Sequence, residues 1–260
     1  MKNTKLIQIN GKPIGDGKQP LICTPLIGRN RAQVLAEVNK VVAKKPDLLE
    51  WRVDFFEAIG NTAEVIATAQ GIKAAADGIP LLFTRRSIKE GGERIALSED
   101  DVVKLYKAIC ESRSVDLVDF EMSNDVDDVR RVRETSRANG IQMVLSFHNF
   151  SYTPGLEFLN QRFLEAERLG AYVAKIAVIP RDRSDVLTLL TATLQSSEKL
   201  RIPLISMSMG AYGSLTRLFG WVFGSTVTFA VGESSSAPGQ VPVEDLNVVL
   251  GILRKSLAEK

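Results

Sequence analysis

Eight short runs of apolar and β-branched residues recur along the chain, with helix-like segments between them. The runs span 21–27, 47–55, 80–87, 115–122, 142–150, 172–180, 203–210 and 226–233. Their apolar character is nearly continuous rather than alternating, which is typical of parallel strands that are covered on both faces. The sequence therefore predicts parallel strands that alternate with helices.

The segments between the runs carry helix signals. Ser98 and Asp101 form a capping-box pattern at the start of one predicted helix. Gly140 and Gly170 stand where helix C-caps belong, just ahead of the fifth and sixth runs. A last amphipathic helix is predicted over 242–257.

A strand and a helix in alternation, without a linker or a low-complexity stretch, predict an α/β fold. We expect one closed (β/α)8 barrel, or TIM barrel, in a single domain over residues 1–260. Residues 1–20 do not fit this unit. The Asn-Gly pair at 10–11 predicts a β-hairpin there, which we expect to close the bottom of the barrel. An open doubly wound sheet is the alternative, but no GxGxxG motif follows the first run.

Composition excludes several classes of protein. The net charge is +2 and the basic residues are spread along the chain, so we expect no nucleic-acid partner. No stretch approaches the ~18 consecutive apolar residues of a membrane span, so we expect no membrane partner. The chain has 2 cysteines, far apart, and its first residues carry no secretion signal. This pattern favours reduced thiols and a cytoplasmic location.

Chemical groups gather at one end of each predicted strand. In a barrel of this kind, catalytic side chains stand at the carboxyl ends of the strands and in the loops that follow. A charged group buried there costs several kcal/mol unless a partner or a ligand compensates. The candidates at these positions are Glu50, Arg52, Arg86, Glu90, Glu121, His148, Phe150, Lys175, Met207, Met209 and the loop 233–240.

Lys175 lies in AKIAVI, where every neighbour along the chain is apolar. Burial among apolar groups favours the neutral form of an amine, which is the form that attacks a carbonyl to give an imine. Alternatively, the lysine extends to the barrel mouth or pairs with a carboxylate. The segment alone leaves these interpretations open.

His148 is the only histidine of the chain and ends the fifth run, in SFHNF. A lone histidine is often structural. Here, however, it would stand at a functional end of the barrel beside Lys175, which lies on the next strand. An imidazole titrates near neutrality, so it is suited to take and return a proton in one catalytic cycle.

Other candidates have plainer interpretations beside the functional ones. Glu50 and Arg52 are two residues apart and project from the same face of a strand, where they form a structural ion pair or bind a ligand. Arg86 begins a loop whose glycines allow it to close over a ligand. Met207 and Met209 are core residues or the wall of a pocket.

The last third of the chain offers groups for an anionic ligand. Arg217 precedes or begins a helix, and it either lies on the surface or clamps a carboxylate. The hydroxyl-rich loop 233–240 is typical of a mobile lid. One histidine and no cysteine cluster make a zinc site improbable, and a Mg²⁺ site at Glu50 and Glu121 stays open although the nearby arginines disfavour it.

Seven segments together resemble one family. They are EWRVDFF, FTRRSIKEGGE, SFHNF, AKIAVIP, SMSMG, RLFGWVFGSTVTFA and SAPGQ, in this order along essentially the whole chain. The chain resembles type I 3-dehydroquinate dehydratase, a lyase of the shikimate pathway, which leads to chorismate and the aromatic amino acids.

The resemblance implies a role for each candidate. Lys175 would form a Schiff base with the ketone, His148 would transfer the proton, and Glu90 would orient the histidine. The residues implied to contact substrate are Glu50, Arg52, Arg86, Arg217, Ser236, Gln240, Met207, Met209, Phe150, Phe229 and Ala237.

The same resemblance implies no metal or organic cofactor and a homodimer. A class I Schiff-base aldolase is the alternative enzyme, although those barrels hold a phosphate where this chain offers Arg217 and the loop 233–240. A barrel that binds a carboxylated ligand without catalysis is the alternative from another class of protein.

Overall fold

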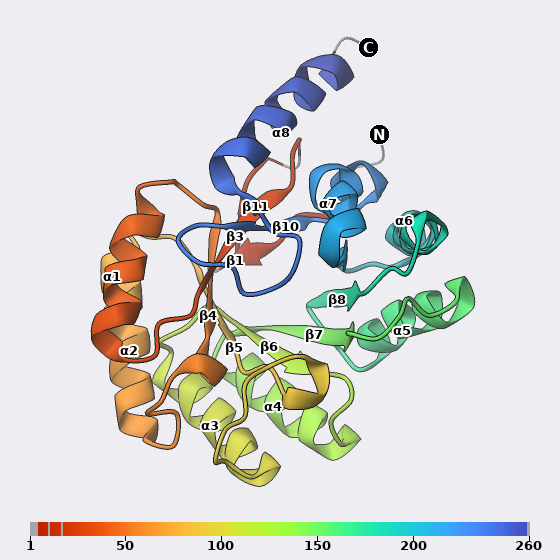
Figure 1. Ribbon diagram of the computed structural model, residues 1–260. Coiled ribbons are helices and arrows are strands. Elements are labelled where there is room, and N and C mark those ends of the chain that lie inside the picture. The colour runs from red at the N-terminus through yellow and green to blue at the C-terminus, as the bar shows by residue number, and fades with distance from the viewer. Residues whose placement is uncertain (1–4, 10, 17, 259–260) are drawn as a thin grey trace.

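Parallel strands curl into a barrel, and helices cover its outside (Figure 1). The computed structural model describes residues 5–9, 11–16 and 18–258. Within them the barrel strands are β3 (Leu21–Leu26), β4 (Leu48–Arg52), β5 (Leu81–Thr84), β6 (Leu117–Glu121), β7 (Gln142–Asn149), β8 (Val173–Val178), β9 (Leu204–Ser208) and β10 (Val227–Val231). Each strand falls inside a run identified from the sequence. The predicted barrel is confirmed, and the open doubly wound sheet is wrong.

The sheet closes between its first and last strands. Strands β3 to β9 pair in parallel in chain order, and β10 pairs with β3. The seam between β9 and β10 is joined by a bridge between Leu204 and Ser225. There the N–H of Thr226 donates to the carbonyl of Leu204 at 2.8 Å. A short strand that the sequence did not predict, β11 (Val241–Pro242), pairs with β10 outside this ring.

Helices follow the strands as expected. They are α1 (Arg31–Val42), α2 (Thr62–Ala75), α3 (Glu99–Ser112), α4 (Val126–Ala138), α5 (Leu156–Arg168), α6 (Arg183–Lys199), α7 (Gly210–Phe219) and α8 (Val243–Ala258), with 3₁₀ turns at Val53–Phe55, Ile88–Glu90 and Gly220–Phe223. The predicted caps are confirmed. Ser98 Oγ accepts the N–H of Asp101 at 3.2 Å, and Gly140 and Gly170 follow their helices with φ of 75° and 82°.

Side chains alternate between the two faces of each strand. The outer face is apolar, and the inner face changes from apolar to polar along the strand. On β6, Val118 and Phe120 pack outward in the large cluster beneath the helices. Leu117 belongs to the inner cluster, and Asp119 and Glu121 point the same way because side chains on a strand repeat every second residue.

The inner face is apolar at the amino ends of the strands and polar further along. The apolar positions at the amino ends are Leu21, Leu48, Leu82, Leu117, Val144, Val173 and Val227. Two residues further along the same strands stand Cys23, Glu50, Thr84, Asp119, Ser146, Lys175 and Phe229. The barrel therefore has a hydrophobic floor, and charged side chains lie directly above it.

The N-terminal hairpin covers this floor. Strands β1 (Gln8–Ile9) and β2 (Lys12–Pro13) pair antiparallel, and Asn10 of the predicted Asn-Gly turn lies outside the described residues. Ile7 is buried among the inner apolar side chains, and the N–H of Gln8 donates to the hydroxyl of Tyr172 at 2.7 Å. The prediction that a hairpin closes the bottom of the barrel is confirmed.

Helix α7 begins earlier than the sequence suggested. We expected Arg217 in a loop before the helix, but α7 starts at Gly210 and Arg217 lies in its last turn. Gly210 permits this start because its φ is +75°, which a residue with a side chain rarely adopts. Arg217 therefore stands on a helix, which fixes the direction of its side chain.

No helix in the described part of the chain has the length and apolar character to cross a bilayer.

Candidate active site

A cavity with about 420 Å³ of empty space opens at the carboxyl ends of the barrel strands. Its lining contains every residue that the resemblance implied for the site, whereas Glu121, also named from the sequence, does not line it. The lining residues are Glu50, Arg52, Arg86, Glu90, Gly91, His148, Phe150, Lys175, Ala177, Met207, Met209, Arg217, Phe229, Ser236, Ala237 and Gln240. Residues from most of the strands, from α7 and from the loops after β5, β7 and β10 thus meet in one place.

Lys175 stands in the middle of the barrel, and its surroundings differ from the expected ones. Its Nζ donates to Asp119 Oδ2 at 2.8 Å and lies 3.4 Å from Glu50 Oε1. Of the interpretations that the sequence left open, the pairing of Lys175 with a carboxylate is observed, and the amine is not surrounded by apolar groups alone. The apolar neighbours Ala174 and Ile176 pack on the outer face of the sheet, so sequence neighbours do not describe the environment of the amine.

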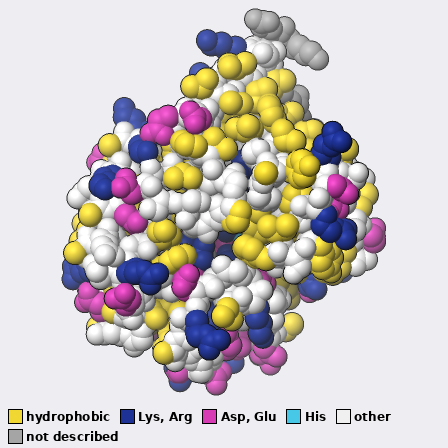
Figure 2. All heavy atoms as spheres, in the orientation of Figure 1, with side chains coloured by type: hydrophobic (Ala, Val, Ile, Leu, Met, Phe, Trp, Pro, Cys, Tyr) yellow, Lys and Arg dark blue, Asp and Glu magenta, His cyan; other side chains and the backbone are white. Residues whose placement is uncertain are grey.

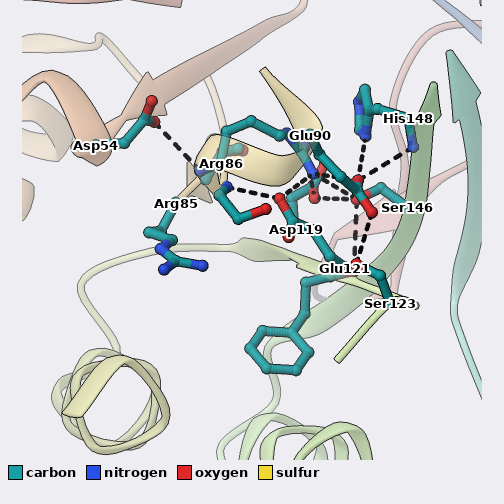
Figure 3. A network of polar contacts seen from close by, with 12 residues as sticks. Asp54, Arg85, Arg86, Glu90, Asp119, Glu121, Ser123, Ser146 and His148 are labelled. Atoms are coloured by element: carbon teal, nitrogen blue, oxygen red, sulfur yellow. Dashed lines mark hydrogen bonds and ion pairs between the residues drawn. The ribbon is translucent and has the colours of Figure 1, made fainter. Parts of the chain in front are cut away.

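His148 is held by Glu90 at two points. Glu90 Oε2 accepts the backbone N–H of His148 at 3.1 Å and lies 2.9 Å from Nδ1 of the ring (Figure 3). With Glu90 ionised, Nδ1 carries the proton and donates to Oε2, so Nε2 is the unprotonated nitrogen. Burial lowers the pKa of His148 well below its usual value, and the charges of Arg86 and Lys175 lower it further. The ring is therefore neutral and able to accept a proton.

Glu90 is itself an unusual carboxyl group. Burial and then the charge of Glu121 raise its pKa to about 7, against the opposing effects of Arg86 and a hydrogen bond from Ser123. Ser123 Oγ donates to Glu90 Oε1 at 2.7 Å. One carboxyl oxygen is thus fixed by a serine and the other by His148, which sets the orientation of the imidazole.

Arg86 binds a cluster of acidic groups (Figure 3). Its Nη2 donates to Asp119 Oδ1 at 2.8 Å, and its Nη1 donates to Glu121 Oε1 at 3.1 Å and to Ser146 Oγ at 2.9 Å. Glu90 Oε2 lies 3.5 Å from the same nitrogen. Much of the hydrogen-bonding capacity expected for a substrate is already taken up inside the protein.

Asp119 is the main residue that the sequence analysis overlooked. It is fully buried and contacts both Arg86 and Lys175. Burial alone would raise its pKa, but the charges of Arg86 and Lys175 hold the pKa well below its usual range. The signal was present in the sequence, because a charged residue interrupts the apolar run LVDFE two positions before Glu121.

The expected ion pair between Glu50 and Arg52 is absent. Arg52 instead binds Asp54 through two hydrogen bonds of 2.8 and 2.7 Å. Glu50 accepts a hydrogen bond from Thr84 Oγ1 at 3.0 Å and faces Lys175. The two residues share a strand face, as predicted, but each has its own partner.

Arg217 enters the cavity from α7 without an acidic partner among the described residues. Its Nη1 donates to the carbonyl of Phe229 at 3.3 Å, and its Nη2 donates to the carbonyl of Pro238 at 3.2 Å. Its Nε has no hydrogen-bond partner although it is buried. Burial lowers the pKa of Arg217 to about 10. A buried cation without a counter-ion is a site for an anion.

The loop after β10 lies over the cavity. The amide of Gln240 folds back on this loop, where its Oε1 accepts the N–H of Ser236 at 3.0 Å and its Nε2 donates to Ser236 Oγ at 3.3 Å. Arg52 Nη1 lies 3.4 Å from the carbonyl of Ser236. The loop is thus tied to the barrel through Arg52 and Arg217.

Apolar groups complete the wall. The ring of Phe229 lies 4.6 Å from Lys175 Nζ, measured to its centroid. Phe150 lies so close above Gly91 that a Cβ there would meet its ring at 2.4 Å. Met207 and Met209 are buried on the same side of the barrel as Phe229. Among the described residues, no group of three or more His, Cys, Asp or Glu is arranged to hold a metal ion.

Comparison with known proteins decides the family. A family model described as Type I 3-dehydroquinase matches residues 22–256. The chain belongs to the type I 3-dehydroquinase family. Members of this family are dehydratases, so the chain is an enzyme of the hydro-lyase class, and the resemblance inferred from its motifs is confirmed. The class I aldolase alternative is left without support.

Relatives in the 3-dehydroquinase family match along their full length. A protein of Albidiferax ferrireducens named 3-dehydroquinate dehydratase is 62% identical over 259 residues, which covers 100% of this chain and 98% of that protein. A crystal structure of the 3-dehydroquinate dehydratase of Geobacillus kaustophilus superposes with a TM-score of 0.94, at 47% identity and 97% and 98% coverage of the two chains. A type I enzyme from Clostridium difficile, solved with covalently modified comenic acid, gives a TM-score of 0.92 at 38% identity, with 97% and 99% coverage.

Proposed function

We propose that this enzyme dehydrates 3-dehydroquinate to 3-dehydroshikimate through an imine on Lys175. The observation that carries the proposal is the placement of Lys175 and His148. Lys175 is the one lysine and His148 the one histidine in the lining of the cavity. They stand on paired strands, with Ser146 opposite Lys175 and His148 opposite Ala177. An amine and a base beside it are the groups that remove a proton next to a ketone.

The reaction follows from these groups. Lys175 attacks the C3 ketone, and loss of water gives an imine that withdraws electrons from C2. His148 accepts the C2 proton on Nε2, while Glu90 holds Nδ1 and balances the charge of the imidazolium. His148 then returns the proton to the C1 hydroxyl, which leaves as water, and hydrolysis of the imine frees the product. No metal or organic cofactor takes part in these steps.

Substrate binding uses the rest of the cavity. We assign the substrate carboxylate to Arg217, because its guanidinium is buried and faces no acidic side chain in the described part of the chain. Glu50, Arg52, Arg86, Ser236 and Gln240 are placed to contact the hydroxyl groups. Phe150, Met207, Met209, Phe229 and Ala237 supply the apolar wall that excludes water.

Borohydride reduction in the presence of 3-dehydroquinate tests the covalent step. We expect a stable adduct on Lys175, located by peptide mass mapping, and none in the Lys175→Ala variant. A barrel that binds ligand without catalysis would give no adduct in the unmodified protein. Sugar phosphates serve as the comparison substrates, and turnover of these compounds but not of 3-dehydroquinate would contradict the proposal.

The His148→Ala variant separates imine formation from the elimination of water. It retains Lys175, so it should still form the reducible imine. Loss of the proton-transfer group should slow elimination by roughly 10² to 10⁴-fold. Near-normal turnover in this variant would show that His148 does not transfer the proton.

We further propose that the enzyme is a cytoplasmic homodimer. Both cysteines are free and buried, which suits a reducing compartment. Exposed apolar side chains gather over the neighbouring helices α7 and α8 (Figure 2) and continue onto α6 and the 3₁₀ turn Gly220–Phe223. They are Leu187, Leu194, Tyr212, Leu215, Val222, Val248 and Ile252. Sedimentation of the purified protein tests the assembly, and a monomer at micromolar concentration would contradict it.

A further inference from the structure

Asp119 touches the reacting nitrogen but has no part in the mechanism above. It lies on β6, two strands away from Lys175, and it does not line the cavity. It contacts Lys175 Nζ from within the barrel without contributing to the lining of the cavity. A carboxylate in this place acts on the nitrogen without contacting the ligand.

The two oxygens of Asp119 have different partners. Oδ1 accepts hydrogen bonds from Arg86 Nη2 at 2.8 Å and from Ser146 Oγ at 2.6 Å. Oδ2 accepts one from Lys175 Nζ at 2.8 Å. All three partners are donors, so the group is bound as an anion. One oxygen is fixed by the protein, and the other is directed at the amine.

Asp119 is the nearest of the charged and titratable groups around this nitrogen. Glu50 on β4 is more distant, at 3.4 Å, and lines the cavity. Arg86 after β5 acts on Asp119 through its charge, and His148 on β7 does so when it is protonated. Cys23 on β3 is buried close enough to sense the charges of both Lys175 and Asp119.

We propose that Asp119 is the counter-ion that keeps the imine nitrogen of Lys175 protonated. This inference rests on the imine chemistry proposed above. One proton must leave the Lys175 ammonium before the neutral amine attacks the ketone. By the end of the step two N–H protons have left with the carbonyl oxygen as water, and a C=N⁺–H group remains. The nitrogen carries one positive charge before and after the step. The same carboxylate therefore pairs with both states without moving.

The positive charge then alternates between two positions, and each has its own carboxylate: Asp119 at the nitrogen and Glu90 at His148. When His148 takes the C2 proton, the C–H electrons form the C2=C3 bond and the C=N electrons move onto nitrogen, which becomes neutral. The charge now lies on the imidazolium, 2.9 Å from Glu90. As the C1–O bond breaks, the C2=C3 electrons form a C1=C2 bond and the nitrogen lone pair forms the iminium again. The positive charge then returns to the nitrogen beside Asp119. The ring of Phe229 beside Nζ also favours a cation there.

The Asp119→Asn variant tests this role through the pH dependence of kcat. An opposite charge at this distance favours the protonated form by about 1 to 3 pH units. Without it the imine loses its proton at lower pH, so the alkaline limb of kcat should move down by about 1 unit or more. Arg86 keeps Glu121 and Glu90 as partners in this variant.

Ser146→Ala is the matched control, because it removes a buried hydrogen bond of Asp119 but leaves both charges. Its alkaline limb should stay where it is in the unmodified protein. An unmoved limb in Asp119→Asn, or an equal shift in Ser146→Ala, would overturn the proposal. A uniform fall in kcat at every pH would likewise assign Asp119 a structural role only.

A measurement on the unmodified protein covers the case in which Asp119→Asn does not fold. Cyanoborohydride reduces a protonated imine, so adduct formation on Lys175 should stay constant up to about pH 9 if the counter-ion is effective. A yield that already falls near neutrality would contradict the inference. Absence of any adduct on Lys175 would instead overturn the proposed function, so the two failures are distinct.

Discussion

At the scale of single residues, Arg217 offers the clearest test of substrate recognition. Its guanidinium is buried with no acidic partner among the described residues, so the energetic cost of the charge is offset when an anion binds. We expect Arg217→Met to lower kcat/KM for 3-dehydroquinate by roughly 10²-fold, since a buried charged contact is worth about 2 to 5 kcal/mol.

The methyl ester of the substrate distinguishes a carboxylate clamp from a general disturbance. The unmodified enzyme should discriminate strongly against the ester, and Arg217→Met should lose this discrimination. Arg85→Met is the control, because Arg85 pairs with Glu99 and does not line the cavity. If the Arg217 variant still discriminates, the substrate carboxylate binds elsewhere.

Glu90 gives a prediction about stability and pH. Its pKa is raised from 4.5 to about 7 in the folded protein, so the folded state holds this proton more tightly than the unfolded state. The resulting stability is fully present below about pH 4.5 and is lost as the pH rises through about 7.

The isosteric change Glu90→Gln removes this titration. The free energy of unfolding of the variant minus that of the unmodified protein should be larger at pH 8 than at pH 5, because only the unmodified protein loses stability over this range. Guanidinium denaturation at both pH values measures the difference. The same relative stability at both pH values would show that Glu90 titrates normally in the folded state.

The residues of the site were predictable, but their partners were not. His148, Lys175 and Arg217 stand out in the sequence because charged or titratable groups at strand ends are rare. Which carboxylate faces Lys175 depends on side chains from strands that are more than fifty residues apart. Asp119 was overlooked because its place in an apolar run made the run look like a strand and nothing more.

At the scale of helices and strands, two caps with left-handed backbone form a matched pair. Gly140 follows α4 with φ of 75°, and Arg113 follows α3 with φ of 52°. A Cβ at Gly140 would meet nothing within 4 Å, so only the backbone conformation opposes a side chain there. We expect Gly140→Ala to lower the free energy of unfolding by about 1 kcal/mol and Arg113→Gly to raise it by a few tenths to about 1 kcal/mol.

Denaturation midpoints of the two variants, compared with that of the unmodified protein, measure these changes in stability. Arg113 is exposed, and its side chain makes no hydrogen bond or ion pair with the described residues that the glycine variant would lose. Two changes of the same sign would mean that packing, rather than backbone conformation, determines the stability of these caps.

Element boundaries show where sequence patterns stop being informative. The strands fell within their predicted runs because burial on both faces requires unbroken apolar segments. The start of α7 was missed because GAYGS has the composition of a loop, and the helix there depends on contacts. A Cβ at Gly213 would lie 2.1 Å from the carbonyl oxygen of Ser208, so a glycine is needed for α7 to pack against the end of β9.

At the scale of the whole molecule, the barrel separates stability from catalysis along its axis. The floor is apolar and covered by the N-terminal hairpin, whereas the cavity opens at the opposite end.

Ile7 is 2% exposed and fills the floor, so Ile7→Ala should lower the free energy of unfolding by about 2 to 4 kcal/mol. Because Ile7 lies far from the cavity lining, kcat and KM should not change at a temperature where the variant is folded. Ile14→Ala, at a partly buried position of the same hairpin, should cost less. A variant at Ile7 that unfolds as the unmodified protein does, or one that is stable but impaired in kcat, would show that floor and site are not independent.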